Sequence, residues 1–328
     1  ALVFADEALA SVRPVPDAPA GGSPEWVALR ESRSPAAAPE FHGAIGRERP
    51  RPYQVTSIDT YLKCPFKYFA SKVLELPEEA EDEAAMTPLG EGRFVHEVLQ
   101  AFFEAWQAAG HGAITADRLD RARSLFAEVA ERSLARLPAG EAALERMKLL
   151  GSAGAAGIGE TVIAAEAARP APVRERLLEY DLDGPFAIAA GGATHEVRLR
   201  GKADRIDLLE DGTFRLVDYK TGRFPDAGRT IQLPIYAVAA AQQLARTRGG
   251  EWRVGEAGYI AFREKKPVRI VIDDGPASAA KLTEGQERLI DTVGRIERGE
   301  FPPRPAQKRL CRTCAYAAVC RKDYVDAG

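Results

Sequence analysis

The sequence predicts an α/β or α+β fold in which one sheet is flanked by helices. Three observations lead to this prediction. Apolar residues recur at helical spacing in the first half of the chain, their period shortens to two over residues 174–222, and helical and strand-like segments then alternate. Hydrophobic residues make up 45% of the chain and charged residues 28%, which is ordinary for a globular protein and excludes a collagen, a coiled coil or a wholly disordered chain.

The length and the ends of the sequence bound the organisation of the protein. Its 328 residues suffice for about two domains and a substantial buried core. It contains no run of about 18 apolar residues, so no membrane span is predicted. The first residues lack the basic and apolar regions of a secretory signal, and there is no initiator Met, so we expect a piece of a longer polypeptide.

The first half of the chain is expected to be a linker followed by helices. Residues from about Val12 to Pro52 are rich in Pro, Ala, Gly, Ser and Arg without hydrophobic periodicity, and we interpret residues 1–52 as a linker or the tail of a preceding domain. A helix should follow with Ser57 as its N-cap, and Pro65 should break it. Residues 89–109 predict a long amphipathic helix, and residues 116–168 predict further helices interrupted by glycines.

The second half is expected to supply the sheet. Alternating apolar and polar residues predict five strands, at residues 174–184, 194–212, 213–222, 254–264 and 266–274. Thr230 can cap a helix over residues 231–245, which separates the third strand from the fourth. A last helix is predicted from Pro276 to Arg298.

The turn between the second and third predicted strands should bring two carboxylates together. Asp211-Gly212 between alternating apolar runs is a strong hairpin signal. If the loop begins at Glu210, Asp204 faces Asp218, and if it contains only Asp211 and Gly212 the register shifts by one residue. In both cases the two carboxylates lie within roughly 5–8 Å, and such opposed charges are destabilising unless a cation lies between them.

Lys220 completes a chemically suggestive set. It follows Asp218 by two residues and therefore projects from the same strand face. Metal-assisted hydrolysis of a phosphodiester needs such a set, because carboxylates can hold Mg²⁺ or Mn²⁺ and an ammonium group can orient water or stabilise negative charge. The alternative is a set of solvated strand residues with one incidental ion pair. Asp207 is expected to face Arg215 in a structural ion pair.

The segments G-x-x-D-R-I-D at residues 201–207 and V-D-Y-K-T-G at residues 217–222 resemble a known signature. It is that of the PD-(D/E)XK nucleases, and in particular of their RecB-like branch, which includes RecB, AddA, AddB and Cas4-type proteins. The resemblance covers roughly residues 53–324 and implies a mixed central sheet flanked by helices, with a helical insertion. It also implies that Asp204 and Asp218 bind the metal and that Lys220 is catalytic.

Further motifs of this family match in the family's order. A GxxxH motif ends at His96, whose equivalent approaches the metal, and a QxxxY motif places Gln232 and Tyr236 on one helix face, which implies catalytic roles for both. The family also has an acidic metal ligand on the strand before the hairpin. Glu175 and Glu179 share one strand face and are both candidates, of which Glu179 is preferred.

The four cysteines form a second pattern. Cys64 lies far upstream, and the other three crowd the C-terminus as Cys311-x2-Cys314-x5-Cys320. Clustered cysteines in a chain without a secretory signal bind metal more often than they form disulfides. The pattern resembles the iron–sulfur staple of AddB and related nucleases, which implies that the four thiolates hold a [4Fe–4S] cluster. Structural Zn²⁺ suits the same thiolates, and spacing alone does not distinguish the two. Because either metal centre would join Cys64 to the distant C-terminal cysteines, it should contribute to stability rather than to bond cleavage.

The net charge of −3 excludes a global basic field, so any surface that binds DNA must be local. Two basic segments could line a path for single-stranded DNA, although a solvated surface is an equal alternative. They are the tail with Arg309, Arg312, Arg321 and Lys322, and the segment with Arg47, Arg49, Arg51 and Tyr53.

The resemblance implies a nuclease domain over residues 53–328, with a helical part at 92–168, a nuclease core at 173–300 and a cluster-binding tail at 301–328. The implied activity is Mg²⁺-dependent exonucleolytic cleavage of DNA, with single-stranded DNA as the expected substrate. The implied context is an AddB-like subunit that works with an AddA-like helicase–nuclease partner in double-strand break repair in the bacterial cytoplasm. The alternatives are a non-cleaving DNA-binding or scaffold module stapled by the cluster, and a stand-alone Cas4-like exonuclease.

Overall fold

The computed structural model describes residues 52–78, 88–226 and 228–320. These residues form two compact units. The sheet unit contains the described residues up to Thr56 and those from Pro88 to Ile290. The cysteine unit joins residues 57–78 to residues 291–320, so the two ends of the described chain fold together.

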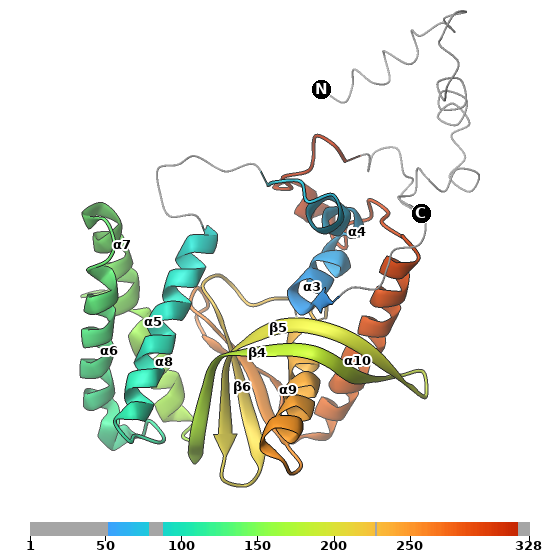
Figure 1. Cartoon of the computed structure of the whole chain (residues 1–328). Helices are drawn as coiled ribbons and strands as arrows, with labels where there is room; N and C mark the ends of the chain where they lie inside the picture. Colours follow the sequence, from blue (N-terminus) through green and yellow to red (C-terminus); the bar gives the residue numbers. More distant parts are fainter. Residues whose placement is uncertain (1–51, 79–87, 227, 321–328) are drawn as a thin grey trace, which may run out of the picture. The chain divides into compact units, whose positions relative to one another are not determined.

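A six-stranded mixed sheet is the centre of the sheet unit (Figure 1). Its strands are β1 (Tyr53–Gln54), β4 (Val173–Ala190), β5 (Ala193–Leu209), β6 (Thr213–Lys220), β7 (Arg253–Ala261) and β8 (Val268–Ile272). β4, β5 and β6 form an antiparallel meander, as their spacing predicts. β7 pairs with β6 in parallel after a helical crossover, β8 pairs with β7 antiparallel, and β1 pairs with β5 in parallel.

Helices cover both faces of this sheet (Figure 1). The helices of the sheet unit are α5 (Pro88–Ala108), α6 (Leu119–Leu134), α7 (Ala139–Leu150), α8 (Ile158–Ala168), α9 (Gln232–Arg248) and most of α10 (Pro276–Glu297), with a 3₁₀ turn at Ala116–Arg118. α5 buries Phe102, Phe103 and Trp106 against α6, α8 and the face of β6 that carries Val217 and Tyr219. α9 packs on the opposite face, which carries Asp218.

The cysteine unit is held together by aromatic packing between its two segments. It contains α3 (Val55–Lys63) from Ser57 onward, α4 (Pro65–Tyr68), a π-helical turn at Phe69–Val73, the end of α10 and a 3₁₀ turn at Lys308–Cys311. The ring of Phe301 stacks on Tyr68 and Phe69 at centroid distances of 6.0 and 5.1 Å. The N–H of Ala306 donates a hydrogen bond of 2.8 Å to the carbonyl of Lys63. These contacts close the chain between its distant ends.

Most predicted elements are present, and three local expectations were wrong. α3 begins at Val55, directly after β1, so Ser57 lies inside the helix and is not its N-cap. β4 continues six residues beyond the predicted end at Gly184, because its hairpin with β5 turns only at residues 191–192. The glycine-rich region of the helical part contains a small hairpin, β2 (Gly151–Ser152) and β3 (Ala155–Ala156), that was not predicted.

The suggested path for single-stranded DNA needs one correction. Tyr53 is buried, because β1 pairs with β5 at Leu199, so its ring cannot stack on a base. Arg309 and Arg312 are exposed in the cysteine unit. The other basic residues of the two segments, Arg47, Arg49, Arg51, Arg321 and Lys322, lie outside the described residues. Among the described helices, none has the length and apolar character that crossing a membrane requires.

Candidate metal and catalytic site

The β5–β6 hairpin has the register of the three-residue loop. Arg205 pairs with Val217 and Asp207 with Arg215, as expected if the loop begins at Glu210. Gly212 has a φ of 79°, a conformation that suits glycine. The ladder ends at Arg205 and Val217, so Asp204 and Asp218 follow it directly on their two strands. The hairpin therefore delivers both carboxylates to the place where β5 and β6 separate.

The backbone between β4 and β5 is distorted at the same level. Leu178 pairs with Arg205 and Tyr180 with Ala203, but no ladder pair is formed by Glu179 and Asp204 between them. Glu179 has a φ of 46°, which is uncommon for a residue other than glycine. The Oδ2 atom of Asp204 instead accepts a hydrogen bond of 2.7 Å from the N–H of Tyr219 on β6. This bond fixes the Asp204 carboxylate across the open end of the hairpin.

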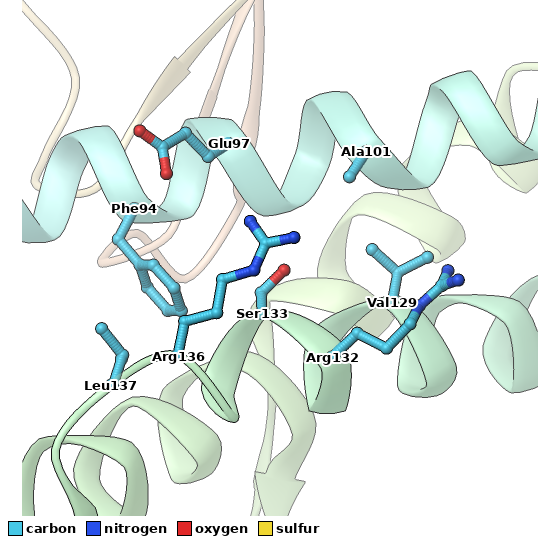
Figure 2. A pocket seen from close by; sticks show the side chains of 8 residues that line it. All are labelled: Phe94, Glu97, Ala101, Val129, Arg132, Ser133, Arg136 and Leu137. Carbon is cyan, nitrogen blue, oxygen red and sulfur yellow. The ribbon is translucent and has the colours of Figure 1, made fainter.

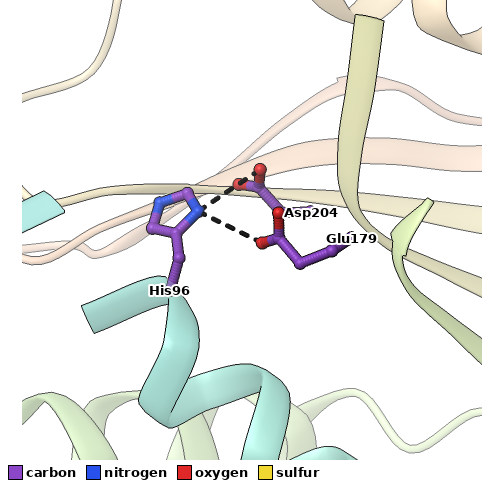
Figure 3. Close-up of side chains that lie close together, drawn as sticks. All are labelled: His96, Glu179 and Asp204. Atoms are coloured by element: carbon purple, nitrogen blue, oxygen red, sulfur yellow. Dashed lines mark ion pairs between the residues drawn. The ribbon is translucent and has the colours of Figure 1, made fainter. Parts of the chain in front are cut away.

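Three side chains from three elements point to one centre (Figure 3). His96 comes from α5, Glu179 from β4 and Asp204 from β5. The Nδ1 atom of His96 lies 3.4 Å from Asp204 Oδ1 and 3.6 Å from Glu179 Oε1. The three potential ligand atoms all lie within 4.8 Å of one another. The side chains are 12–26% exposed, so the centre is open to solvent.

This cluster has the donor atoms for a divalent cation. Burial disfavours the imidazolium form of His96, but hydrogen bonds to Asp204 and Glu179 outweigh burial and raise its pKa to about 10. In the metal-free protein the imidazolium thus offsets the charge of the two carboxylates. Carboxylate oxygens are ligands of Mg²⁺ and Mn²⁺, and an imidazole nitrogen is a ligand for Mn²⁺ as a transition metal. Ligands of one Mg²⁺ lie at most about 4.2 Å apart, so small side-chain rotations would suffice.

The buried side chains of Asp218 and Gln232 form a neighbouring group with the partly exposed Lys220. Lys220 Nζ lies 2.6 Å from Asp218 Oδ2 and donates a hydrogen bond of 3.1 Å to Gln232 Oε1. Gln232 Nε2 donates a hydrogen bond of 2.8 Å to Asp218 Oδ1 and closes the triangle. Burial and the nearby charge of Asp204 raise the pKa of Asp218 to about 7 despite the lysine. The carboxyl group of Asp218 therefore ionises less readily than that of a solvated aspartate.

Tyr236 lies one turn beyond Gln232 on α9 and packs under β5. Its side chain is buried, and burial together with the charge of Asp218 raises its pKa. A Cβ atom at Gly201 would come within 2.7 Å of the Tyr236 ring, so this close approach of α9 to β5 requires glycine. The glycine of the G-x-x-D-R-I-D segment, three residues before Asp204, thus has a packing role.

Residues 54–321 match the family model of the PD-(D/E)XK nuclease superfamily. The chain belongs to this superfamily. The mixed central sheet flanked by helices that the sequence predicts is thereby confirmed. The protein is a nuclease by family, and nucleases of this superfamily use divalent metal ions, for which the acidic cluster offers a site.

Comparisons with individual proteins add little to the superfamily match. No curated protein matches the chain significantly. The structure of SSO0001 aligns with 13% identity and a TM-score of 0.35, covering 93% of this chain and 98% of its own. The structure of a candidate exonuclease from Eubacterium rectale aligns with 13% identity and a TM-score of 0.35, covering 83% of this chain and 90% of its own. TM-scores this low carry no argument about this nuclease.

The structure separates the two acidic candidates on β4. Glu179 joins the cluster with His96 and Asp204, whereas Glu175 forms an ion pair of 2.8 Å with Arg248 of α9. Their strand positions share one face by alternation, but the distorted backbone at Glu179 turns only that residue toward the cluster. The sequence carries no signal for this distortion.

A pair of substitutions tests this assignment. Glu179→Gln is expected to lower nuclease activity by at least about 100-fold, because it removes a charged ligand candidate from the cluster. Glu175→Gln removes the same charge from an exposed ion pair on the same strand and should leave activity within about twofold, since such pairs contribute little. Initial rates of Mg²⁺-dependent cleavage measure both. Equal losses in the two variants would refute the role of Glu179.

A buried ionic network lies behind the site, and the sequence predicted only one of its ion pairs. The predicted ion pair between Asp207 and Arg215 is present at 2.6 Å. Arg205 Nη2 also binds Glu166 of α8 at 2.5 Å, and Arg205 Nη1 donates to Tyr219 Oη at 2.8 Å. Arg176 completes the group, so three arginines face two carboxylates, all of them buried. Because Arg205 and Tyr219 follow Asp204 and Asp218 directly, the network fixes both strands at the site.

A separate pocket of about 290 Å³ lies between α5 and α6 (Figure 2). Its apolar lining includes Phe94 and Val129, and its polar lining residues are Glu97, Arg132, Ser133 and Arg136. None of the predicted site residues lines it. The pocket is therefore distinct from the cluster around His96, whose three residues are drawn in Figure 3.

Proposed function

We propose that the sheet unit is a deoxyribonuclease that hydrolyses DNA phosphodiesters with Mg²⁺ or Mn²⁺ held by His96, Glu179, Asp204 and Asp218. One observation carries the proposal. Ligand atoms from α5, β4 and β5 converge to within 4.8 Å of one another, beside the ion pair of Asp218 and Lys220. A superfamily match without this geometry would suggest a nuclease fold, and the geometry suggests that the site is intact.

The residues of the site would divide the chemistry among them. A divalent cation bound to the carboxylates polarises a phosphodiester and lowers the pKa of a water molecule. The N–H of Tyr219 donates a hydrogen bond to Asp204 and fixes the position of its carboxylate. Lys220 is 28% exposed, so its ammonium can reach an attacking water or a phosphate oxygen where negative charge develops. Gln232 binds both Lys220 and Asp218 and orients them, and Tyr236 supports the strand behind Asp204.

End-labelled DNA tests the activity and its mode. We expect the protein to degrade linear single-stranded DNA with Mg²⁺ and to lose that activity in EDTA. An exonuclease needs a free end, so circular single-stranded DNA of the same sequence should survive. Cleavage of the circle would replace the exonuclease proposal by an endonuclease. No cleavage of either substrate, with binding retained, would favour the alternative of a non-cleaving DNA-binding module.

We further propose that the cysteine unit holds a [4Fe–4S] cluster through Cys64, Cys311, Cys314 and Cys320. All four cysteines are free of disulfides and partly buried in the same unit. Cys64 is the residue that directly precedes α4. Burial raises the pKa of the Cys64 thiol, and the nearby thiols of Cys314 and Cys311 raise it further, which supports a common site for these sulfurs.

Structural Zn²⁺ is the alternative occupant, because four thiolates suit a tetrahedral zinc ion as well as an iron–sulfur cluster.

Anaerobic purification followed by iron and sulfide analysis tests this centre. We expect about four iron and four sulfide per chain. Cys64→Ser should lose most of the iron and unfold at a temperature lower by at least about 5 °C, because the clip between the two chain segments is removed. Thr313→Ser, between two of the cysteines, serves as the control and should retain the iron. Stoichiometric zinc without iron would establish the zinc alternative.

The combination of nuclease motifs with this cysteine pattern also supports an AddB-like role in double-strand break repair. In that role the protein would bind an AddA-like helicase–nuclease subunit and degrade a strand that the helicase unwinds. Reconstitution with such a subunit tests the proposal. ATP should then be required for degradation of duplex DNA, whereas unchanged activity without ATP would favour a stand-alone, Cas4-like exonuclease.

A further inference from the structure

The turn between β7 and β8 carries an unusual concentration of positive charge. Arg263, Lys265 and Lys266 are exposed within four consecutive residues, and Arg223 is exposed on the loop that follows β6. Glu264 is the single acidic residue among residues 262–269. The chain as a whole has a net charge of −3, so this surface departs in sign from the average of the molecule.

Backbone hydrogen bonds attach this turn to the end of the strand that carries Lys220. The N–H of Phe262 donates to the carbonyl of Lys220 at 3.0 Å, and the N–H of Arg263 donates to that of Gly222 at 3.3 Å. Glu264 Oε1 accepts a bond of 3.4 Å from the N–H of Phe224. The two loops therefore form one surface beside Lys220, and the single acidic side chain of the turn is used to join them.

The cations of this surface differ from those on the other side of the site. On β5, the strand that leads to Asp204, Arg200 lies 3.3 Å from Asp183 and Lys202 lies 3.9 Å from Asp181. Among the described residues, no ion pair is formed by Arg223, Arg263, Lys265 or Lys266. An approaching polyanion would meet cations paired with aspartates at Arg200 and Lys202, and exposed cations without such ion pairs among the described residues at the two loops.

We propose that Arg223, Arg263, Lys265 and Lys266 form a phosphate-binding surface for the DNA strand beside the scissile bond. Arg223 follows Lys220 by three residues, so it lies within roughly 10 Å along the chain. On one strand of a duplex, successive phosphates are about 3.4 Å apart along the helix axis. The phosphates that contact this surface would therefore lie about one to three nucleotides from the bond that is cut. The surface reads charge and not sequence. This inference rests on the proposed nuclease function.

The test is the salt dependence of DNA binding by the full chain in EDTA, where no cleavage occurs. Anisotropy of a labelled single-stranded oligonucleotide gives the affinity at several salt concentrations. The triple variant Arg263→Gln, Lys265→Gln, Lys266→Gln should bind about 10- to 50-fold more weakly at physiological salt. Its slope of log K against log salt should be shallower by about 2, since each lost phosphate contact removes about 0.7.

The control removes the same charge from α6 and the turn before it, which carry none of the site residues. Arg118→Gln, Arg121→Gln, Arg132→Gln should leave the affinity within about twofold and the slope unchanged, because these exposed arginines lie on another surface. Equal losses in the two triple variants, equal binding by the β7–β8 variant and the wild type, or no binding by the wild type would overturn the proposal. Wild-type binding without cleavage in Mg²⁺ would refute the nuclease function and leave this surface standing.

Discussion

Asp218→Asn is expected to abolish DNA cleavage, lowering kcat by at least about 10³. The substitution keeps the shape of the side chain but removes one of the negative charges that a divalent ion needs. It also removes the partner that holds Lys220 Nζ at 2.6 Å. The expected loss therefore combines a weakened metal site with a misplaced ammonium group.

The same substitution should not unfold the protein. Burial and the charge of Asp204 raise the pKa of Asp218 from 3.8 to about 7 in the folded, metal-free state. A raised carboxyl pKa means that ionisation costs stability above pH 3.8, by an amount that grows until about pH 7. A neutral Asn avoids this cost, so the thermal midpoint at neutral pH should equal or exceed that of the wild type. Activity and stability should thus change in opposite directions.

Asp181→Asn is the matched control for this prediction. Asp181 lies on β4 near the site but is largely exposed, and its nearest cation is Lys202 at 3.9 Å. Removal of its charge should leave kcat within about twofold. Cleavage rates under single-turnover conditions and thermal unfolding compare the two variants. Retained cleavage in Asp218→Asn, or loss of cleavage through unfolding, would contradict the assigned role of Asp218.

Glu166→Gln is expected to have the largest effect on stability, lowering the free energy of unfolding by about 3–5 kcal/mol. Glu166 binds Arg205 at 2.5 Å and Arg215 at 2.6 Å in the buried network. Its loss would leave three buried arginines with Asp207 as their single buried carboxylate, and an uncompensated buried charge is costly. Urea unfolding at neutral pH measures the change.

The pH dependence of this effect has a defined sign. Burial opposes the ionised form of Glu166, but the charges of Arg205 and Arg215 outweigh burial and lower its pKa from 4.5 to about 2. Its contribution to stability is therefore full above pH 4.5 and is lost as the pH falls toward 2. The difference between the wild type and Glu166→Gln should shrink over that range. A constant difference would show that packing and not charge is responsible.

Glu128→Gln on α6 controls for the loss of a glutamate charge from a helix of the same region. Glu128 is exposed, so its replacement should change the free energy of unfolding by less than about 0.5 kcal/mol. Arg205 and Tyr219 are hydrogen-bonded to each other in the network, and they directly follow Asp204 and Asp218 in the chain. The remaining folded fraction of Glu166→Gln is therefore expected to bind metal more weakly as well. A destabilisation of Glu166→Gln no larger than that of the control would contradict the network's role.

The hairpin that organises the site could be predicted because its signals are local. Asp211-Gly212 fixes the turn, and the alternation on both sides leaves two registers, one of which the structure has. The sequence could not decide as firmly between Glu175 and Glu179 as metal ligands, because their difference depends on a backbone distortion of β4 opposite β5. Strand alternation treats the two residues alike.

The contacts that the sequence did not reveal are those between distant segments. Glu166 has no motif, and its role follows only from the packing of α8 against the sheet. Tyr53 was expected near DNA, but it is buried because β1 pairs with β5. A strand of two residues carries no sequence pattern that predicts this pairing. Ser57 was expected as an N-cap because of its residue type, but α3 follows directly from β1 and begins at Val55, two residues before Ser57. In each case tertiary contacts override local preference.

Titration of the metal-free protein with Mn²⁺ in a calorimeter tests most directly whether the residues around Asp204 hold a divalent ion. The wild type is expected to bind saturably, and Asp204→Asn should bind at least about 10-fold more weakly, with Asp181→Asn indistinguishable from the wild type. Equal Mn²⁺ affinity in the wild type and Asp204→Asn would contradict the metal site and, with it, the mechanism of hydrolysis.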